Sequence, residues 1–306
     1  MPRVCHAQLV ASGPIPNLEY LRLEIRGADY LVGSAGSGSP VLLLHGFPQT
    51  HFCWRRIIPT LSQRHTVVAP DLRGYGASSA PGGGPEGQGF TKREMANDLV
   101  DLMVSLGLEH FAVVGHDRGA RVAYRMALDH PNRVDQLVVL NVLPTLEQFE
   151  RMRADLSLGY WPWFLLAQPA PFPERLLAAE PEHFLRFIFD SWTRVPGAID
   201  AVALDEYLRA MRGTTIASIC ADYRASFWFD QHHDAADRGV GRRIECPVLV
   251  ITGDEEIQLA DAPTVWRDWA HDLRARTLPG GHFIPEEAPQ ELAIALMEFV
   301  DGSAVD

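Results

Sequence analysis

Val114-Gly115-His116-Asp117-Arg118-Gly119 is the stretch that decides the fold of this 306-residue chain. An apolar run that predicts a buried strand ends here, and a helix is expected to begin directly after it. The two glycines that flank Asp117 indicate a strained turn, because no side chain fits between the strand and the helix at these positions. Such a turn presents the aspartate above the sheet. A helix N-cap is the alternative role, because a carboxylate suits the N-terminal end of a helix dipole.

Two further motifs favour the strained turn over the N-cap. His45-Gly46-Phe47-Pro48 directly follows the apolar residues Val41 to Leu44, where the backbone N–H of Phe47 could pair with that of Arg118 to hold a developing oxyanion. Gly281-His282-Phe283 is predicted to lie in a turn between a short strand and the last helix. This order along the chain places a histidine base, His282, after the nucleophile. A histidine without such neighbours would more often be a surface or core residue. The assignment of His282 as the base therefore depends on the other two motifs.

The rest of the chain predicts an α/β protein with a mostly parallel sheet flanked by helices. An initial pair of strands is expected at residues 20–25 and 30–32, and a helix is expected from Arg93 to Leu106. From Leu146 to about Arg243 the chain has aromatic-rich helical segments and no strand-like run. The predicted domains are therefore a core of residues 1–144 and 244–306 and a helical cap of residues 145–243. Buried strands are expected at residues 41–44, 67–69, 111–114, 137–140 and 247–251.

Composition narrows the classes of function. The formal net charge is −12, which disfavours nucleic acid and anionic membranes as partners and requires a local positive pocket for any anionic substrate. No apolar run approaches the roughly 20 residues of a membrane helix. The N-terminal residues 1–7 have no features of a secretory signal, so a cytoplasmic location is expected. The four cysteines are widely scattered, which predicts free thiols and neither disulfides nor a zinc site.

An aspartate nucleophile implies a particular chemistry. A carboxylate is already an anion at pH 7, so Asp117 can displace a leaving group from carbon without help from a base. The product is an ester on Asp117, which water must hydrolyse. His282 would take a proton from that water, and the N–H groups of Phe47 and Arg118 would stabilise the oxyanion. Neither step needs a metal or an organic cofactor, and water is the only cosubstrate.

These motifs resemble the α/β-hydrolase superfamily and, within it, the haloacetate (fluoroacetate) dehalogenases. The resemblance implies the α/β-hydrolase fold with an inserted helical cap, hydrolysis of carbon–halide bonds in a small 2-haloacid, and a homodimer. It runs over nearly the whole chain and is carried by residues 45–51, Gly115-His116-Asp117-Arg118-Gly119-Ala120-Arg121, residues 166–171 and residues 222–225.

The resemblance also implies substrate-binding residues. It assigns the substrate carboxylate to Arg118 and Arg121, which lie one and four residues beyond the nucleophile on the expected helix. Guanidinium groups bind carboxylates with two parallel hydrogen bonds. Pairing with acidic neighbours on the surface is the alternative for either arginine. Trp163 and Tyr223 align with the family's halide-binding aromatic residues, although packing is the commoner role of such side chains.

Two positions depart from the family pattern. Pro162 replaces a histidine of the members that handle fluoride, and because proline offers no donor, we expect chloro-, bromo- or iodoacetate rather than fluoroacetate as substrate. Asn141 stands where these enzymes usually carry the acid that orients the histidine. The relocated acid is expected at Glu256 in Gly253-Asp254-Glu255-Glu256, with Asp254 as the reserve and a solvated acidic loop as the alternative.

Other functions remain open. An epoxide hydrolase would use the same Asp117 and His282, with Tyr223 and either Tyr160 or Tyr207 as proton donors, but a neutral epoxide does not explain the paired arginines. A catalytically weak ligand-binding homologue would fit the substitutions at Pro162 and Asn141. A serine esterase ranks last, because the turn contains no serine.

Overall fold

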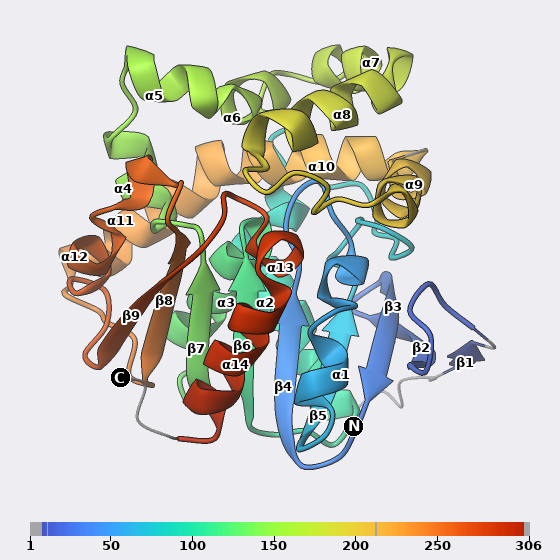
Figure 1. Ribbon diagram of the computed structural model, residues 1–306. Coiled ribbons are helices and arrows are strands. Elements are labelled where there is room, and N and C mark those ends of the chain that lie inside the picture. Colours follow the sequence, from blue (N-terminus) through green and yellow to red (C-terminus); the bar gives the residue numbers. More distant parts are fainter. Residues whose placement is uncertain (1–7, 11, 212, 303–306) are drawn as a thin grey trace.

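The computed structural model describes residues 8–10, 12–211 and 213–302, and a nine-stranded sheet lies at the centre of this part of the chain (Figure 1). The strand order is β1-β2-β3-β5-β4-β6-β7-β8-β9. The first three strands and the β3–β5 pair are antiparallel, whereas all pairs from β5 to β9 are parallel. The strands are β1 (Gln8–Val10), β2 (Glu19–Ile25), β3 (Ala28–Ala35), β4 (Ser39–Leu44), β5 (His65–Pro70), β6 (Phe111–His116), β7 (Val134–Leu140), β8 (Val248–Gly253) and β9 (Leu273–Leu278).

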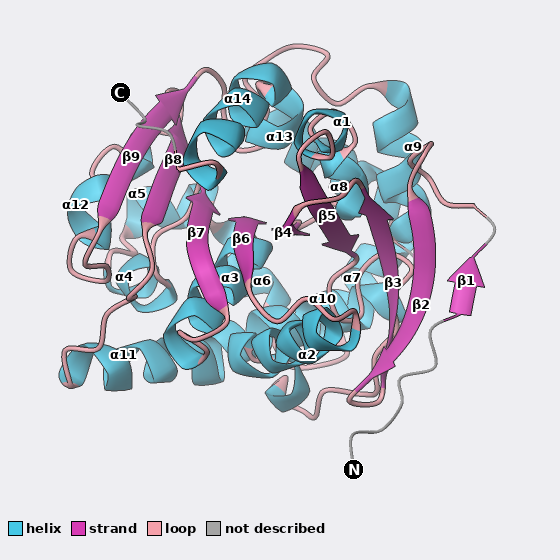
Figure 2. Ribbon diagram, turned by 90° about the horizontal axis from the view of Figure 1, so that it is seen from below, coloured by secondary structure: helices cyan, strands magenta, loops and turns pink. Residues whose placement is uncertain are grey.

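Helices cover both faces of the sheet. The view along the sheet shows α1 and α14 on one side and α2 and α3 on the other (Figure 2). All residues of β6 and β8 are buried as a result, which is why these strands are continuous apolar runs in the sequence. The helices of these layers are α1 (Ile58–Leu61), α2 (Lys92–Ser105), α3 (Arg118–Asp129), α12 (Ala262–Trp266), α13 (Ile284–Glu287) and α14 (Pro289–Val300), with short 3-10 turns η1 (His51–Trp54), η2 (Gln88–Phe90) and η4 (Ile257–Leu259).

Between β7 and β8 the described residues form helices joined by loops, with a single isolated bridge at Ile244, and we call residues 145–239 the helical segment. It lies over the carboxyl ends of the parallel strands (Figure 1). Ligands of open α/β sheets bind at these strand ends, so the helical segment is placed to cover a site. It comprises α4 (Thr145–Glu150), α5 (Ala154–Gly159), α6 (Trp161–Leu166), α7 (Phe172–Ala179), α8 (Pro181–Trp192), α9 (Ala201–Ala210), α10 (Thr214–Ala225), the π-helical turn η3 (Ser226–Asp230) and α11 (Gln231–Gly239).

The α/β class with a mostly parallel sheet is therefore confirmed, while the domain boundaries at residues 144 and 244 stay predictions.

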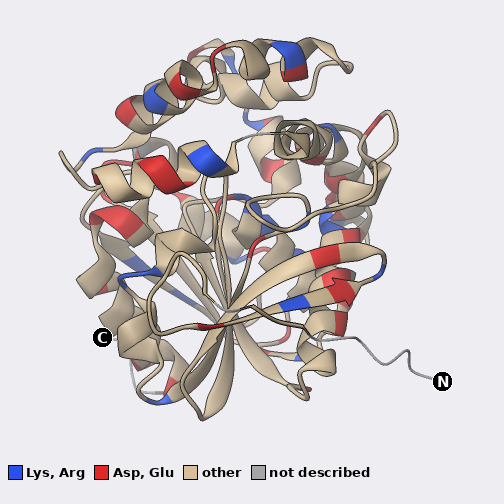
Figure 3. Ribbon diagram, turned by 90° about the vertical axis from the view of Figure 1, so that its right-hand side faces the viewer, with Lys and Arg blue, Asp and Glu red and all other residues tan. Residues whose placement is uncertain are grey.

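Acidic and basic residues are intermingled over the ribbon (Figure 3). Within the described residues, no helix is long and apolar enough to cross a membrane. Cys53, Cys220 and Cys246 are free thiols. Cys5 and the rest of residues 1–7 lie outside the described residues.

Candidate active site

Asp117 occupies the strained turn between β6 and α3, with a positive φ of 47°. The flanking glycines are required sterically: a Cβ on Gly119 would lie 2.3 Å from the Leu44 carbonyl oxygen, and a Cβ on Gly115 would lie 2.5 Å from the Cα of Ala120. The Asp117 side chain makes no capping hydrogen bond to α3. The carboxylate is therefore presented to the site, and the alternative role as an N-cap is excluded.

The loop after β4 holds one oxygen of this carboxylate. The backbone N–H of Phe47 donates a hydrogen bond of 2.9 Å to Asp117 Oδ1. Gly46 permits the approach, because a Cβ there would lie 2.5 Å from the Cβ of Asp117. Burial alone would raise the pKa of the Asp117 carboxyl, but the nearby His282 and Arg118 lower it below its ordinary value. Asp117 is consequently an anion at neutral pH.

His282 faces the other oxygen. Its Nε2 lies 3.8 Å from Asp117 Oδ2, and this nitrogen has no hydrogen-bond partner among the described residues. Burial lowers the pKa of His282 to about 3, and the neighbouring His116 and Arg121 act in the same direction. The imidazole is neutral at physiological pH and can accept a proton. The structure thus brings Asp117 and His282 together, as the sequence predicts.

The backbone around His282 is anchored from three directions. Asn141 Nδ2 donates to the carbonyl oxygens of Gly281 and His282, each at 2.9 Å, and Asn141 Oδ1 accepts from the N–H of Gly253. His116 Nε2 donates to the His282 carbonyl at 2.7 Å. The N–H of His282 donates to the carbonyl of Trp192 in the helical segment at 3.1 Å. Asn141 is therefore a backbone anchor for the His282 turn, a role that an aspartate could not fill with these two carbonyls.

The two acids expected to support His282 lie in different places. Glu256 is on the wall of the cavity that contains Asp117 and His282, and its carboxylate accepts a hydrogen bond from Gln258. No hydrogen bond joins it to His282 within the described part of the chain. Burial raises the pKa of Glu256 to about 7. Asp254, the reserve choice, instead accepts from the N–H of Gly280 at 2.9 Å.

The two arginines that follow the nucleophile are buried and differ in their partners. The Nε and Nη2 of Arg118 bind the carboxylate of Asp222 at 2.9 Å, which leaves Nη1 without a partner. Arg121 donates from Nη1 to the carbonyl of Leu143 and to Thr145, while its Nε has no partner. Among the described residues, no carboxylate forms an ion pair with Arg121. Burial lowers the pKa of the Arg121 guanidinium, and the neighbouring Arg118 acts in the same direction, whereas Asp117 opposes the shift.

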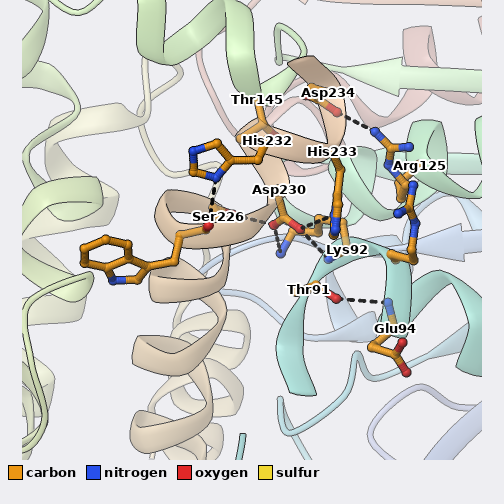
Figure 4. A network of polar contacts seen from close by, with 12 residues as sticks. Thr91, Lys92, Glu94, Arg125, Thr145, Ser226, Asp230, His232, His233 and Asp234 are labelled. Atoms are coloured by element: carbon orange, nitrogen blue, oxygen red, sulfur yellow. Dashed lines mark hydrogen bonds and ion pairs between the residues drawn. The ribbon is translucent and has the colours of Figure 1, made fainter. Parts of the chain in front are cut away.

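Asp222 ties Arg118 into a buried polar network at the junction with the helical segment. Lys92 forms an ion pair with Asp222, and its backbone N–H donates to Asp230 at 2.8 Å. Ser226 accepts a 2.7 Å hydrogen bond from Arg118 and donates to Asp230 at 3.0 Å. Figure 4 shows Lys92, Ser226 and Asp230 converging between two helices, α2 and α11 with its preceding turn. Arg118 is thereby fixed in place, and pairing on the surface is not its role.

Aromatic rings enclose the two guanidinium groups. Arg118 lies over the ring of Tyr223, with its Cζ 4.2 Å from the ring centroid, and Arg121 lies over the ring of Trp163 at 4.4 Å. Tyr223 also packs against Phe47 with ring centroids 5.5 Å apart. Cation–π contacts of this kind stabilise buried guanidinium groups. Trp163 lines the cavity, whereas the two arginines that pack against it do not.

The cavity at the nucleophile has a volume of about 370 Å³. Trp192, which the sequence did not single out, packs its ring against His282 at 5.1 Å between centroids. Tyr160 lies on the cavity wall, whereas Tyr207 is buried elsewhere and hydrogen-bonds Glu286. Pro162 is buried in the first turn of α6. The cavity is lined by Asp117, Asp155, Leu156, Leu158, Gly159, Tyr160, Trp161, Trp163, Phe187, Ser191, Trp192, Arg194, Glu256, Gln258 and His282.

Comparisons with known proteins agree with this fold. A family model described as the alpha/beta hydrolase fold matches residues 39–289. A fluoroacetate dehalogenase from Burkholderia sp is 42% identical over 88% of this chain and 89% of its own length. A soluble epoxide hydrolase from Corynebacterium sp. (strain C12) is 30% identical over 87% of this chain and 91% of its own. The crystal structure of a protein from Nostoc sp PCC 7120, described as an alpha/beta hydrolase, has a TM-score of 0.90 and 44% identity, covering 93% of this chain and 98% of that one.

Proposed function

This chain belongs to the α/β-hydrolase family, and we propose that it removes the halide from a small 2-haloacid by hydrolysis. The observation that carries the proposal is the buried Arg121, whose guanidinium forms no ion pair with a carboxylate among the described residues. A buried cation is costly unless an anion accompanies it, so a substrate carboxylate is the natural partner. The fluoroacetate dehalogenase relative supports the same class of substrate.

The proposed first step is displacement at carbon. Because Phe47 N–H holds Asp117 Oδ1, the free Oδ2 attacks the carbon that bears the halogen. A carbon–oxygen bond forms, and the carbon–halogen bond breaks with its electron pair leaving on the halide. The substrate carboxylate is proposed to bind the unpartnered N–H groups of Arg118 and Arg121. Trp163 packs on both guanidinium groups, so this binding requires the indole to move. The Trp163 indole N–H and the Tyr223 hydroxyl are the proposed donors to the halide.

The second step clears the ester. The neutral His282 takes a proton from water as the water oxygen attacks the carbonyl carbon of Asp117. The resulting oxyanion forms on Oδ1, which already lies at the N–H of Phe47, and the N–H of Arg118 completes the oxyanion hole. Collapse breaks the bond between the Asp117 carbonyl carbon and the substrate oxygen, and the His282 imidazolium returns its proton to that oxygen. The 2-hydroxyacid leaves, and the Asp117 carboxyl releases its remaining proton to solvent, which restores the carboxylate. Glu256, when ionised, stabilises the imidazolium from the cavity wall.

Pro162 sets the proposed preference among the halogens. It has no N–H or O–H to offer a departing ion, and it is held in the first turn of α6. Fluoride needs strong hydrogen bonds to leave, so chloro-, bromo- and iodoacetate are the proposed substrates, with defluorination much slower. Pro162→His is expected to raise the ratio of fluoride to bromide release, and an unchanged ratio would argue against this role.

Epoxide hydrolysis is the second candidate, because the Corynebacterium relative is an epoxide hydrolase and Tyr160 lies on the cavity wall as a proton donor. The deciding experiment measures bromide release from bromoacetate and diol formation from styrene oxide with the same preparation. We expect the rate of bromide release from bromoacetate to exceed the rate of diol formation from styrene oxide. Diol formation without bromide release would replace the proposal, and binding of bromoacetate without either product would indicate a catalytically weak homologue.

The homodimeric state and the cytoplasmic location stay predictions. Sedimentation equilibrium tests the first: a dimer has twice the 34.0 kDa mass of the chain. Cell fractionation tests the second.

A further inference from the structure

We propose that Glu287 is a positioning residue that fixes the base, His282, to the helical segment, and that it is needed for hydrolysis of the ester and not for its formation. Glu287 lies at the end of α13, five residues after His282, and its side chain is buried. This inference rests on the proposed function, because the two steps it separates are those of the ester mechanism.

The Glu287 carboxylate binds both residues that flank the base. Oε2 accepts from the N–H of Gly281 at 3.0 Å, and Oε1 accepts from the N–H of Phe283 at 2.8 Å. The two bonds bracket His282 in the sequence. They fix the turn on its N–H side, while Asn141 and His116 bind its carbonyl groups from the other side.

The same carboxylate binds the helical segment just after α8. Oε2 also accepts from the N–H of Arg194 at 2.7 Å and from that of Val195 at 3.0 Å. Two turns of backbone, residues 281–283 and 192–195, are thus joined through one side chain. Their approach is close: a Cβ on Gly281 would lie 2.7 Å from the Trp192 carbonyl oxygen.

A carboxylate side chain meets this demand because it can accept hydrogen bonds at both oxygens. Oε2 accepts three of the four backbone N–H groups, and Oε1 accepts the fourth. Glutamine has the same shape, but its NH₂ group in place of either oxygen would face at least one of these N–H donors and leave it unpaired in a buried site. We therefore expect Glu287→Gln to loosen the turn without leaving a cavity.

The consequence for the reaction depends on which step uses His282. Attack by Asp117 on the substrate needs no base, so it does not depend on the position of the imidazole. Activation of water does, and a displacement on the scale of 1 Å can cost on the order of 100-fold in rate. A loosened turn should therefore slow the second step alone.

Glu286→Gln is the matched control. Glu286 precedes Glu287 in α13 and is also buried, but its carboxylate binds the side chains of Arg55 and Tyr207 and forms no hydrogen bond with residues 281–283. Both variants and the wild type are mixed with bromoacetate under rapid-quench conditions. Bromide release and the mass of the peptide that contains Asp117 are followed in time.

We expect Glu287→Gln to release a burst of close to one bromide per active site, with an alkylation rate within about twofold of that of the wild type. The carboxymethyl ester on Asp117 should accumulate and decay on the order of 10- to 100-fold more slowly than in the wild type. Glu286→Gln should show no such selective slowing. Equal slowing of both steps in Glu287→Gln, or unchanged hydrolysis, would overturn the inference.

A second measurement does not depend on the substrate. Hydrogen exchange should become faster in residues 281–283 and 193–195 of Glu287→Gln and stay unchanged there in Glu286→Gln. Unchanged exchange in both variants would contradict the anchoring itself. If exchange responds but even the wild type releases no bromide, the proposed function fails while the anchoring stands.

Discussion

The two carboxylate oxygens of Asp117 have different surroundings, and this difference assigns them different parts of the reaction. Oδ1 accepts the Phe47 N–H, while Oδ2 lies toward Nε2 of His282. In the proposed mechanism, the oxygen that is already hydrogen-bonded becomes the carbonyl oxygen of the ester and then the oxyanion. The site is therefore organised before substrate arrives, which is how a preorganised oxyanion hole lowers a barrier.

Arg121 gives a prediction at the scale of one residue. Arg121→Met removes the charged hydrogen-bond donor and keeps an unbranched side chain. We expect the binding of the substrate carboxylate to weaken by roughly 1.5–3 kcal/mol. This loss corresponds to a rise in KM for bromoacetate of roughly 10- to 150-fold. Steady-state kinetics with bromoacetate measures this, and bromoacetamide, a neutral analogue, is the control. An equal change in KM for both compounds, or none for bromoacetate, would refute carboxylate binding.

Glu256 gives a prediction about pH. The pKa of His282 is lowered to about 3, so the base stays neutral from pH 5 to pH 9 and contributes no titration there. Loss of the Asp117 charge in the ester lowers that pKa further, because the carboxylate favours the imidazolium. Burial raises the pKa of Glu256 to about 7, so the fraction of Glu256 that is ionised grows as the pH rises through this value.

We therefore expect the rate of ester hydrolysis, measured in single turnovers, to rise as the pH increases through about 7 in the wild type. The profile of Glu256→Gln should be flat and low over the same range. If the wild type is also flat between pH 5 and pH 9, Glu256 does not support His282, and anchoring of the turn alone orients the base.

At the scale of elements, the site is built where the carboxyl ends of β6, β7 and β8 meet. Asn141 follows β7 with a φ of 54° and links the end of β8 to the His282 turn.

The sequence predicts the parallel strands well, because buried parallel strands are mostly apolar. It cannot predict the partners of Asn141, because the His282 turn lies about 140 residues further along the chain.

Asn141→Asp tests this anchor. A carboxylate cannot donate to the two carbonyl oxygens of Gly281 and His282, so we expect the free energy of unfolding to fall by roughly 1–3 kcal/mol and ester hydrolysis to slow. Urea denaturation and single-turnover kinetics measure the two effects. Faster hydrolysis with unchanged stability would show instead that an acid at this position restores support for His282.

At the scale of the whole molecule, the helical segment supplies groups that the core cannot. Asp222 binds Arg118, which lies 104 residues earlier in the chain, and the carbonyl of Trp192 accepts a hydrogen bond from the N–H of His282.

The local motifs around Asp117 and His282 are visible in the sequence because each is contiguous. Trp192 and Glu287 were missed because their roles come from tertiary contacts, although Glu287 stands only five residues after His282.

The central claim is that Asp117 forms an ester which His282 clears, and trapping that ester tests it most directly. In His282→Gln, alkylation should proceed while hydrolysis stops, because the attack by a carboxylate needs no base and the attack by water does. Mass spectrometry after incubation with bromoacetate should find a carboxymethyl group on the peptide that contains Asp117, and Asp117→Ala should carry none. A His282→Gln protein that releases bromide continuously, or that shows no adduct on Asp117, would contradict the account.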